Sequence, residues 1–196
     1  MNKYYRKIHL SNFDEIQSQC LEAIKKHDKV YERYEENTSY YLLDHRVVEE
    51  TSPALVKALA EYDLKCCYAM AYVMYKKTHT RVHMDKHFHR CRINIPIMNC
   101  ENTYTCFYEN VNLQERITPL GLYHKIADDT EYLPVDKIEM DSPAIIAVQE
   151  PHKVIMPDNA PAPRITMSLG TVTDPSFLLD PEWFKKIFKK REDQLL

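Results

Sequence analysis

Short apolar stretches separated by polar breaks dominate the chain from residue 65 onwards. Proline or aspartate separates most of these stretches, and no long helical pattern alternates with them. The pattern predicts a mainly β protein, a sandwich or jelly roll, rather than repeating strand–helix–strand units. Eight stretches have the length and composition of strands, and they span 66–75, 92–98, 103–108, 121–126, 132–138, 144–149, 152–156 and 164–171.

The first 64 residues are different in character, because apolar residues recur there at helical spacing. Ser52-Pro53 has the form of a helix start, with proline in the first turn. The polar, tyrosine-rich segment before it is predicted as a loop. In chain order we expect a strand at 4–10, a helix at 12–27, a loop over 28–50 that contains a short strand at 40–43, and a helix at 53–62.

The end of the chain, 180–196, is predicted to be a capped amphipathic helix with aromatic residues on one side and lysines on the other. We expect its aromatic face to pack on the sheet, and a homodimer formed through this helix is the main alternative; such a helix can also bind a membrane. We expect one domain over 1–196. It would comprise a helical N-terminal support region at 1–64, a β core at 65–171 and this C-terminal helix.

Composition excludes several classes of function. Two glycines in 196 residues rule out the P-loop and the dinucleotide-binding glycine fingerprint, since each needs glycines at fixed spacings. The six cysteines form no CxxC motif, the chain starts without an apolar signal segment, and no apolar run is long enough to cross a bilayer. We therefore expect a cytoplasmic protein with reduced thiols and no membrane partner. A zinc site from Cys100 and Cys106 is a minor alternative.

A candidate metal site begins at His83-Met84-Asp85. The alternation of isoleucines at 93, 95 and 97 indicates that the chain here is extended, so His83 and Asp85 point to the same side. An imidazole and a carboxylate on one side are two ready ligands. Two alternatives stay open: a surface pair in a charged loop, or a helical histidine stripe formed by His79, His83 and His87.

A third ligand and a cation are expected from later strands. His152 follows one apolar strand, and Arg164 follows it after the proline-rich loop 157–163. Adjacent antiparallel strands joined by this loop would bring His152 and Arg164 side by side. Thr166 and Ser168 share the face of Arg164. Two histidines and a carboxylate fit either a facial iron triad or a zinc hydrolase site, and a guanidinium beside hydroxyls suits a carboxylate.

At these residues the sequence resembles the non-haem iron(II)/2-oxoglutarate-dependent dioxygenases, whose HxD…H…R pattern stands here as His83, Asp85, His152 and Arg164. The resemblance covers about residues 65–171. It implies a double-stranded β-helix (jelly-roll) core, with iron(II), 2-oxoglutarate and O₂ as cofactor and co-substrates. It also implies hydroxylation of a substrate C–H bond coupled to decarboxylation of 2-oxoglutarate. Arg164, with Thr166 or Ser168, would bind the far carboxylate, and ascorbate is expected to support activity.

Further co-substrate contacts are expected on neighbouring strands. Arg92 and Asn94 form a polar face opposite the isoleucines, so Asn94 is a candidate. A tyrosine often joins the arginine in the family, and Tyr104 is our candidate among several tyrosines on these strands. Two other functions remain open, namely a jelly-roll metal-dependent hydrolase or isomerase that does not use 2-oxoglutarate, and a non-catalytic metal-binding module.

The partner is expected to be a small molecule or a peptide side chain. Between residues 76 and 92 six basic residues accompany Asp85, and a basic rim beside the metal would attract an anionic substrate. Nucleic acid is disfavoured, because the run lacks interleaved aromatic residues and the whole chain has a net charge of −3. His79, His87 and His89 are placed at this rim.

Overall fold

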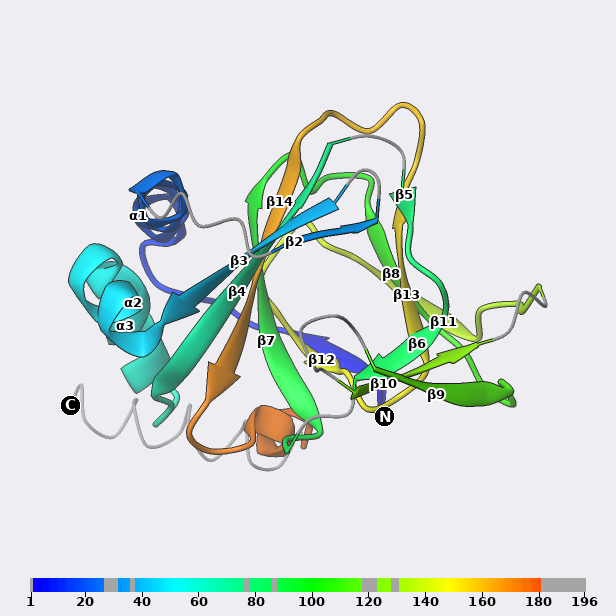
Figure 1. The fold of residues 1–196 in the computed structure, drawn as a ribbon. Coiled ribbons are helices and arrows are strands. Elements are labelled where there is room, and N and C mark those ends of the chain that lie inside the picture. Colours follow the sequence, from blue (N-terminus) through cyan, green and yellow to red (C-terminus); the bar gives the residue numbers. More distant parts are fainter. Residues whose placement is uncertain are drawn as a thin grey trace.

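The computed structural model describes residues 2–26, 32–35, 38–75, 78–85, 88–117, 123–127 and 131–180. Within these ranges two antiparallel sheets, each of seven strands, face one another as a sandwich (Figure 1). The predicted mainly β, double-stranded β-helix (jelly-roll) fold is therefore confirmed. None of the helices in the described part of the chain is long and apolar enough to span a membrane.

The first sheet joins strands from both ends of the described chain. Its two longest neighbours, β14 and β4, pair over the whole length of β14. In order across the sheet, the strands are β1 (Tyr5–Lys7), β12 (Ala144–Ala147), β7 (Cys91–Met98), β14 (Arg164–Thr171), β4 (Cys66–Met74), β3 (Thr38–Asp44) and β2 (Glu32–Glu35). The sheet thus takes three strands from the predicted support region at 1–64.

The second sheet is made from the middle of the chain. In order it contains β11 (Asp136–Glu139), β8 (Tyr104–Phe107), β13 (His152–Met156), β6 (His83–Asp85), β10 (Tyr123–Ala127) and β9 (Leu113–Ile117), and β5 (Thr78–His79) pairs with β13. The predicted strand at 132–138 begins only at Asp136, and β9 was not predicted. The described chain ends with a 3₁₀ helix, η1 (Pro175–Leu179), and the predicted C-terminal helix lies outside the described residues.

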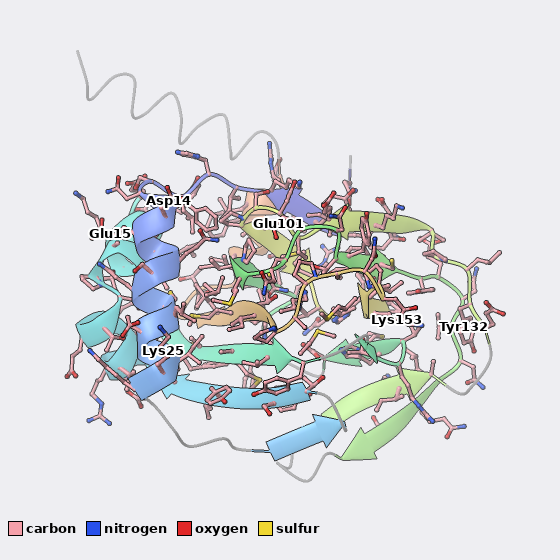
Figure 2. All side chains as sticks on the ribbon, turned by 90° about the horizontal axis from the view of Figure 1, so that it is seen from above. Asp14, Glu15, Lys25, Glu101, Tyr132 and Lys153 are labelled. Atoms are coloured by element: carbon pink, nitrogen blue, oxygen red, sulfur yellow. The ribbon has the colours of Figure 1, made fainter. Side chains whose placement is uncertain are left out.

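Three helices cover the outer face of the first sheet: α1 (Phe13–Lys26), α2 (His45–Thr51) and α3 (Pro53–Ala60). In α1 the acidic residues Asp14 and Glu15 occupy the first turn and Lys25 the last, which suits the helix dipole (Figure 2). Helices α1 and α3 were predicted, whereas α2 was assigned to a loop. Its signal was Asp44, whose side chain caps the helix by accepting from the Arg46 N–H.

The two faces of the first sheet differ in polarity. Isoleucines 93, 95 and 97 of β7 and the alternate residues 165, 167 and 169 of β14 are buried against the helices. The other face therefore carries Arg92 and Asn94 from β7 and Arg164, Thr166 and Ser168 from β14, and it looks towards the second sheet. A separate apolar cluster that includes Phe107, Ala144 and Ile146 joins the two sheets across this interior.

Two connections differ from the predictions. The turn at 100–102 was expected to join a hairpin, but β7 belongs to the first sheet and β8 to the second, so the chain crosses between sheets there. Likewise, β13 and β14 were expected to be adjacent, and they also lie on opposite sheets. The physical reason is that each strand already has partners on both sides within its own sheet. His152 and Arg164 therefore approach the interior from opposite walls.

Candidate metal centre

Three side chains of the second sheet form a group that can hold a metal ion. His83 and Asp85 lie two residues apart on β6 and point to the same side, and His152 of β13 pairs directly with His83. One ligand atom from each of the three lies within 4.8 Å of the others. The His83 Nε2 and Asp85 Oδ1 atoms are 3.8 Å apart, and the two imidazole centroids are 4.3 Å apart.

Backbone carbonyls set the orientation of both imidazoles. The Nδ1 atom of His83 is 2.8 Å from the Arg81 carbonyl oxygen, and that of His152 is 2.9 Å from the Glu150 carbonyl oxygen. Because a carbonyl only accepts, each Nδ1 carries the proton and donates it. With the proton on Nδ1, the neutral form of each ring has its lone pair on Nε2. Both histidines are thus oriented as Nε2 ligands in the same way, by a hydrogen bond from Nδ1 to the backbone carbonyl of the residue two positions earlier.

The donor set fits a divalent metal. Ligand atoms that are each about 2.1 Å from one ion lie at most about 4.2 Å apart. The 3.8 Å separation between His83 and Asp85 satisfies this limit, and the 4.8 Å outer bound requires only a small contraction. Two imidazoles and one carboxylate on one side leave the remaining positions of an octahedral ion open. The same donor set suits iron(II) and zinc(II).

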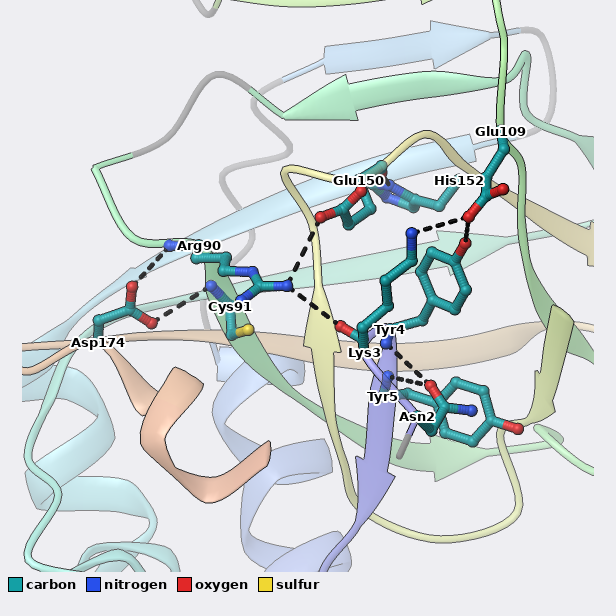
Figure 3. Close-up of polar contacts among 10 residues, drawn as sticks. All are labelled: Asn2, Lys3, Tyr4, Tyr5, Arg90, Cys91, Glu109, Glu150, His152 and Asp174. Carbon is teal, nitrogen blue, oxygen red and sulfur yellow. Dashed lines mark hydrogen bonds and ion pairs between the residues drawn. The ribbon is translucent and has the colours of Figure 1, made fainter. Parts of the chain in front are cut away.

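The chain that leads into His152 is tied to the N-terminus by polar contacts (Figure 3). The Nη2 atom of Arg90 is 3.6 Å from Glu150 Oε1 and donates to the Lys3 carbonyl oxygen at 3.4 Å. Asp174 accepts from the backbone N–H groups of Arg90 and Cys91. These contacts hold the residue whose carbonyl orients His152. Nothing in the sequence pattern had indicated them.

Arg164 is placed on the inner face of the first sheet and is only 2% exposed. Its Nε donates to Thr103 Oγ1 at 2.9 Å, and its Nη1 lies 3.4 Å from the Met74 sulfur. Among the described residues it has no acidic partner, and burial lowers the pKa of its guanidinium. A buried cation of this kind needs an anion. Thr103, which orients it, was missed because a lone threonine at the start of a strand carries no sequence signal.

The other predicted co-substrate residues divide into two groups. Thr166 and Ser168 are buried on the inner face with Arg164, and Ser168 pairs with Asn94 of β7. The Asn94 Oδ1 atom is buried and has no hydrogen-bond partner among the described residues. Tyr104 is not brought to this group: it lies on the opposite face of β8 from Phe107, under the ammonium of Lys137.

A different tyrosine occupies the inner face near Arg164. Tyr72 of β4 pairs with Thr166, and its ring packs edge-on against Tyr40 at 5.0 Å between centroids. The alternation of β4 contained this information, since Tyr68 and Tyr72 share one face. The sequence could not show that β4, rather than β8, is the strand beside β14 on that face.

The described residues do not form the histidine stripe or the cysteine zinc site that the sequence left open as alternatives. His79 and His83 lie on strands β5 and β6, so no helical histidine stripe exists there, and His87 lies outside the described residues. Cys100 and Cys106 belong to separate apolar clusters, and all six cysteines are unpaired. Arg92 is only 6% exposed and is not part of a basic rim.

Replacing Gly170 with alanine is expected to destabilise the inner face. A Cβ atom at this position would lie 2.2 Å from Cε1 of Tyr68. The ring would have to move and would lose its bond to Arg92, at a cost of about 1–3 kcal/mol in the free energy of unfolding. Urea denaturation measures this loss. The same substitution in a Tyr68→Ala background removes the clash, so an equal loss in both backgrounds would contradict this explanation.

No model of a known protein family matches the chain, and neither does the sequence of any curated protein. Similar solved structures include the coconut allergen cocosin, at 10% identity and TM-score 0.38, over 77% of this chain and 30% of that one. A Pseudomonas putida prolyl-4-hydroxylase matches at 11% identity and a TM-score of 0.38, over 87% of this chain and 92% of that chain. A Cellulomonas parahominis L-ribose isomerase matches at 13% identity and a TM-score of 0.37, over 91% of this chain and 90% of that chain. The chain spans about a third of the cocosin chain. At these scores and identities the likeness carries no argument about activity.

Proposed function

We propose that this protein is an iron(II)- and 2-oxoglutarate-dependent dioxygenase that hydroxylates a substrate C–H bond. One observation carries the proposal: a His-Asp-His group on one sheet looks into the same interior as a buried arginine on the other sheet. The arginine, Arg164, has no acidic partner among the described residues. A dicarboxylate that chelates a metal at one end and meets this cation at the other satisfies both groups at once.

The residues of the chain have separate roles in this proposal. His83, Asp85 and His152 would hold iron(II), with both imidazoles already oriented through Nδ1. Arg164 would bind the far carboxylate of 2-oxoglutarate, and the hydroxyls of Thr166 and Ser168 lie on the same face to assist it. Bound iron(II) with 2-oxoglutarate and O₂ supplies the oxidation, in which R–H becomes R–OH while 2-oxoglutarate becomes succinate and CO₂.

A succinate-release assay tests the proposal. Protein supplied with iron(II), ascorbate and 2-oxoglutarate is expected to release succinate in a screen of amino acids, peptides and nucleotides, and N-oxalylglycine is expected to inhibit this release. Binding of 2-oxoglutarate should require a divalent metal. If metal-loaded protein binds neither 2-oxoglutarate nor N-oxalylglycine, the proposal is wrong, and the triad then serves a hydrolase, an isomerase or a structural metal.

A further inference from the structure

A second arginine is buried in the same interior. Arg92 of β7 is 6% exposed, and the only side-chain hydrogen bond it makes among the described residues runs from Nη2 to the Tyr68 hydroxyl at 2.6 Å. The guanidinium also lies over the Tyr68 ring, 5.3 Å from its centroid. The Nε–H is buried and has no partner in the described part of the chain. A phenol does not neutralise a cation, and among the described residues Arg92 forms no ion pair.

The position of Arg92 is at the metal end of the interior. Arg92 pairs with Ile146 of β12, and two residues later the Val148 carbonyl accepts from the Asp85 backbone N–H at 2.9 Å. Burial lowers the pKa of Arg92, but Tyr72 and the carboxylate of Asp85 outweigh this effect and raise it overall. Arg92 thus lies within electrostatic range of a metal ligand without forming an ion pair with it.

Tyr68 is built to hold this arginine in place. Its ring lies over Gly170, where no side chain larger than hydrogen fits, and its hydroxyl meets Arg92 Nη2. Asn94 lies two residues along the same face, and its buried Oδ1 atom has no partner within the described ranges. Unpaired polar atoms on neighbouring inner positions indicate that a polar molecule completes this end of the interior.

We propose that Arg92, held by Tyr68, binds a carboxylate of the primary substrate and places that substrate beside the metal. This inference rests on the proposed function, in which 2-oxoglutarate already uses the metal at one end and Arg164 at the other. No carboxylate of the co-substrate then remains for Arg92. A metal bound to Asp85 also takes up the negative charge that partly balances Arg92, so metal loading prepares the arginine for an anion. The substrate class is a carboxylic acid, free or as an acidic side chain, rather than a nucleic acid.

The Nε–H resonance of Arg92 provides a direct test. The full chain, labelled with ¹⁵N-arginine and loaded with zinc(II) and N-oxalylglycine, is titrated with acetate, the common L-amino acids and simple hydroxy acids. We expect the Arg92 Nε–H signal to shift with at least one acid and not with its amide. Arg92→Lys should lower the affinity for that acid at least about tenfold, because lysine lacks the planar fork. The exposed Arg46→Lys is the matched control and should leave the affinity unchanged.

Three outcomes overturn the inference. The Arg92 signal could stay fixed with every acid at saturation, it could respond equally to an acid and its amide, or it could already shift on addition of N-oxalylglycine, which would assign Arg92 to the co-substrate. The Arg164 Nε–H signal separates this inference from the proposed function. If N-oxalylglycine leaves Arg164 unchanged, the dioxygenase proposal fails, while the response of Arg92 to acids is still read from zinc-loaded protein.

Discussion

Asp85→Ala is expected to lower the affinity for divalent metal by more than about 100-fold. Loss of an outer partner of a metal ligand typically costs about 10–100-fold, and this substitution removes a ligand itself. The carboxylate is also the only negative charge of the triad, so two neutral imidazoles would remain. Anaerobic titration with iron(II), or with cobalt(II) in competition with a chelator, measures the change.

Two controls make this result specific to the triad. Asp14→Ala removes a carboxylate from the first turn of α1, on the other side of the first sheet, and should leave metal affinity unchanged. His89→Ala removes a histidine from the same part of the sequence as His83 without touching the triad. Metal binding by Asp85→Ala at the wild-type affinity would show that the three side chains do not form the metal site.

Arg164→Met is expected to lower 2-oxoglutarate affinity by about 100-fold or more while leaving metal affinity intact. In the described part of the chain the buried guanidinium contacts a threonine and a thioether but no acid, so it should attract the far carboxylate strongly. The ligand-free protein should not lose stability. Replacing a buried ion pair by apolar side chains of similar volume is often neutral or stabilising by about 1–4 kcal/mol, and a buried charge without an ion partner is costlier still to keep.

Urea unfolding with and without 2-oxoglutarate measures both effects of Arg164→Met. Wild-type protein loaded with metal should gain stability from 2-oxoglutarate, and the variant should not. Arg46→Met, at an exposed arginine that pairs with Asp44, is the control for loss of a guanidinium. If Arg164→Met unfolds much more easily and still binds 2-oxoglutarate normally, then Arg164 is a structural residue.

The fold class was predictable because buried residues recur at the period of the strand or helix that carries them. Alternation along β7 and β14 predicted both the strands and which residues share a face, and the helices α1 and α3 followed from the spacing of their apolar residues. The alternation also predicted that His83 and Asp85 share a side. These are local properties, since each depends only on neighbours within one element.

Strand partners were not predictable in the same way. No local pattern assigns β8 and β13 to one sheet and β7 and β14 to the other, because strand pairing depends on contacts between residues far apart in the chain. That gap accounts for the choice of Tyr104 over Tyr72 and for the expected hairpin at 100–102. It also hid the buried state of Arg92, which looked like one more basic residue in a charged run.

Because His152 and Arg164 lie on opposite sheets, the separation of the two sheets determines how long a molecule must be to contact both residues. The apolar cluster around Phe107, Ala144 and Ile146 packs between the walls and so sets that separation. A molecule that reaches from the metal group to Arg164 must match that separation in length, and a molecule one carbon longer or shorter would not contact both ends. Selection by chain length would then reside in the packing between the sheets rather than in any residue that touches the molecule.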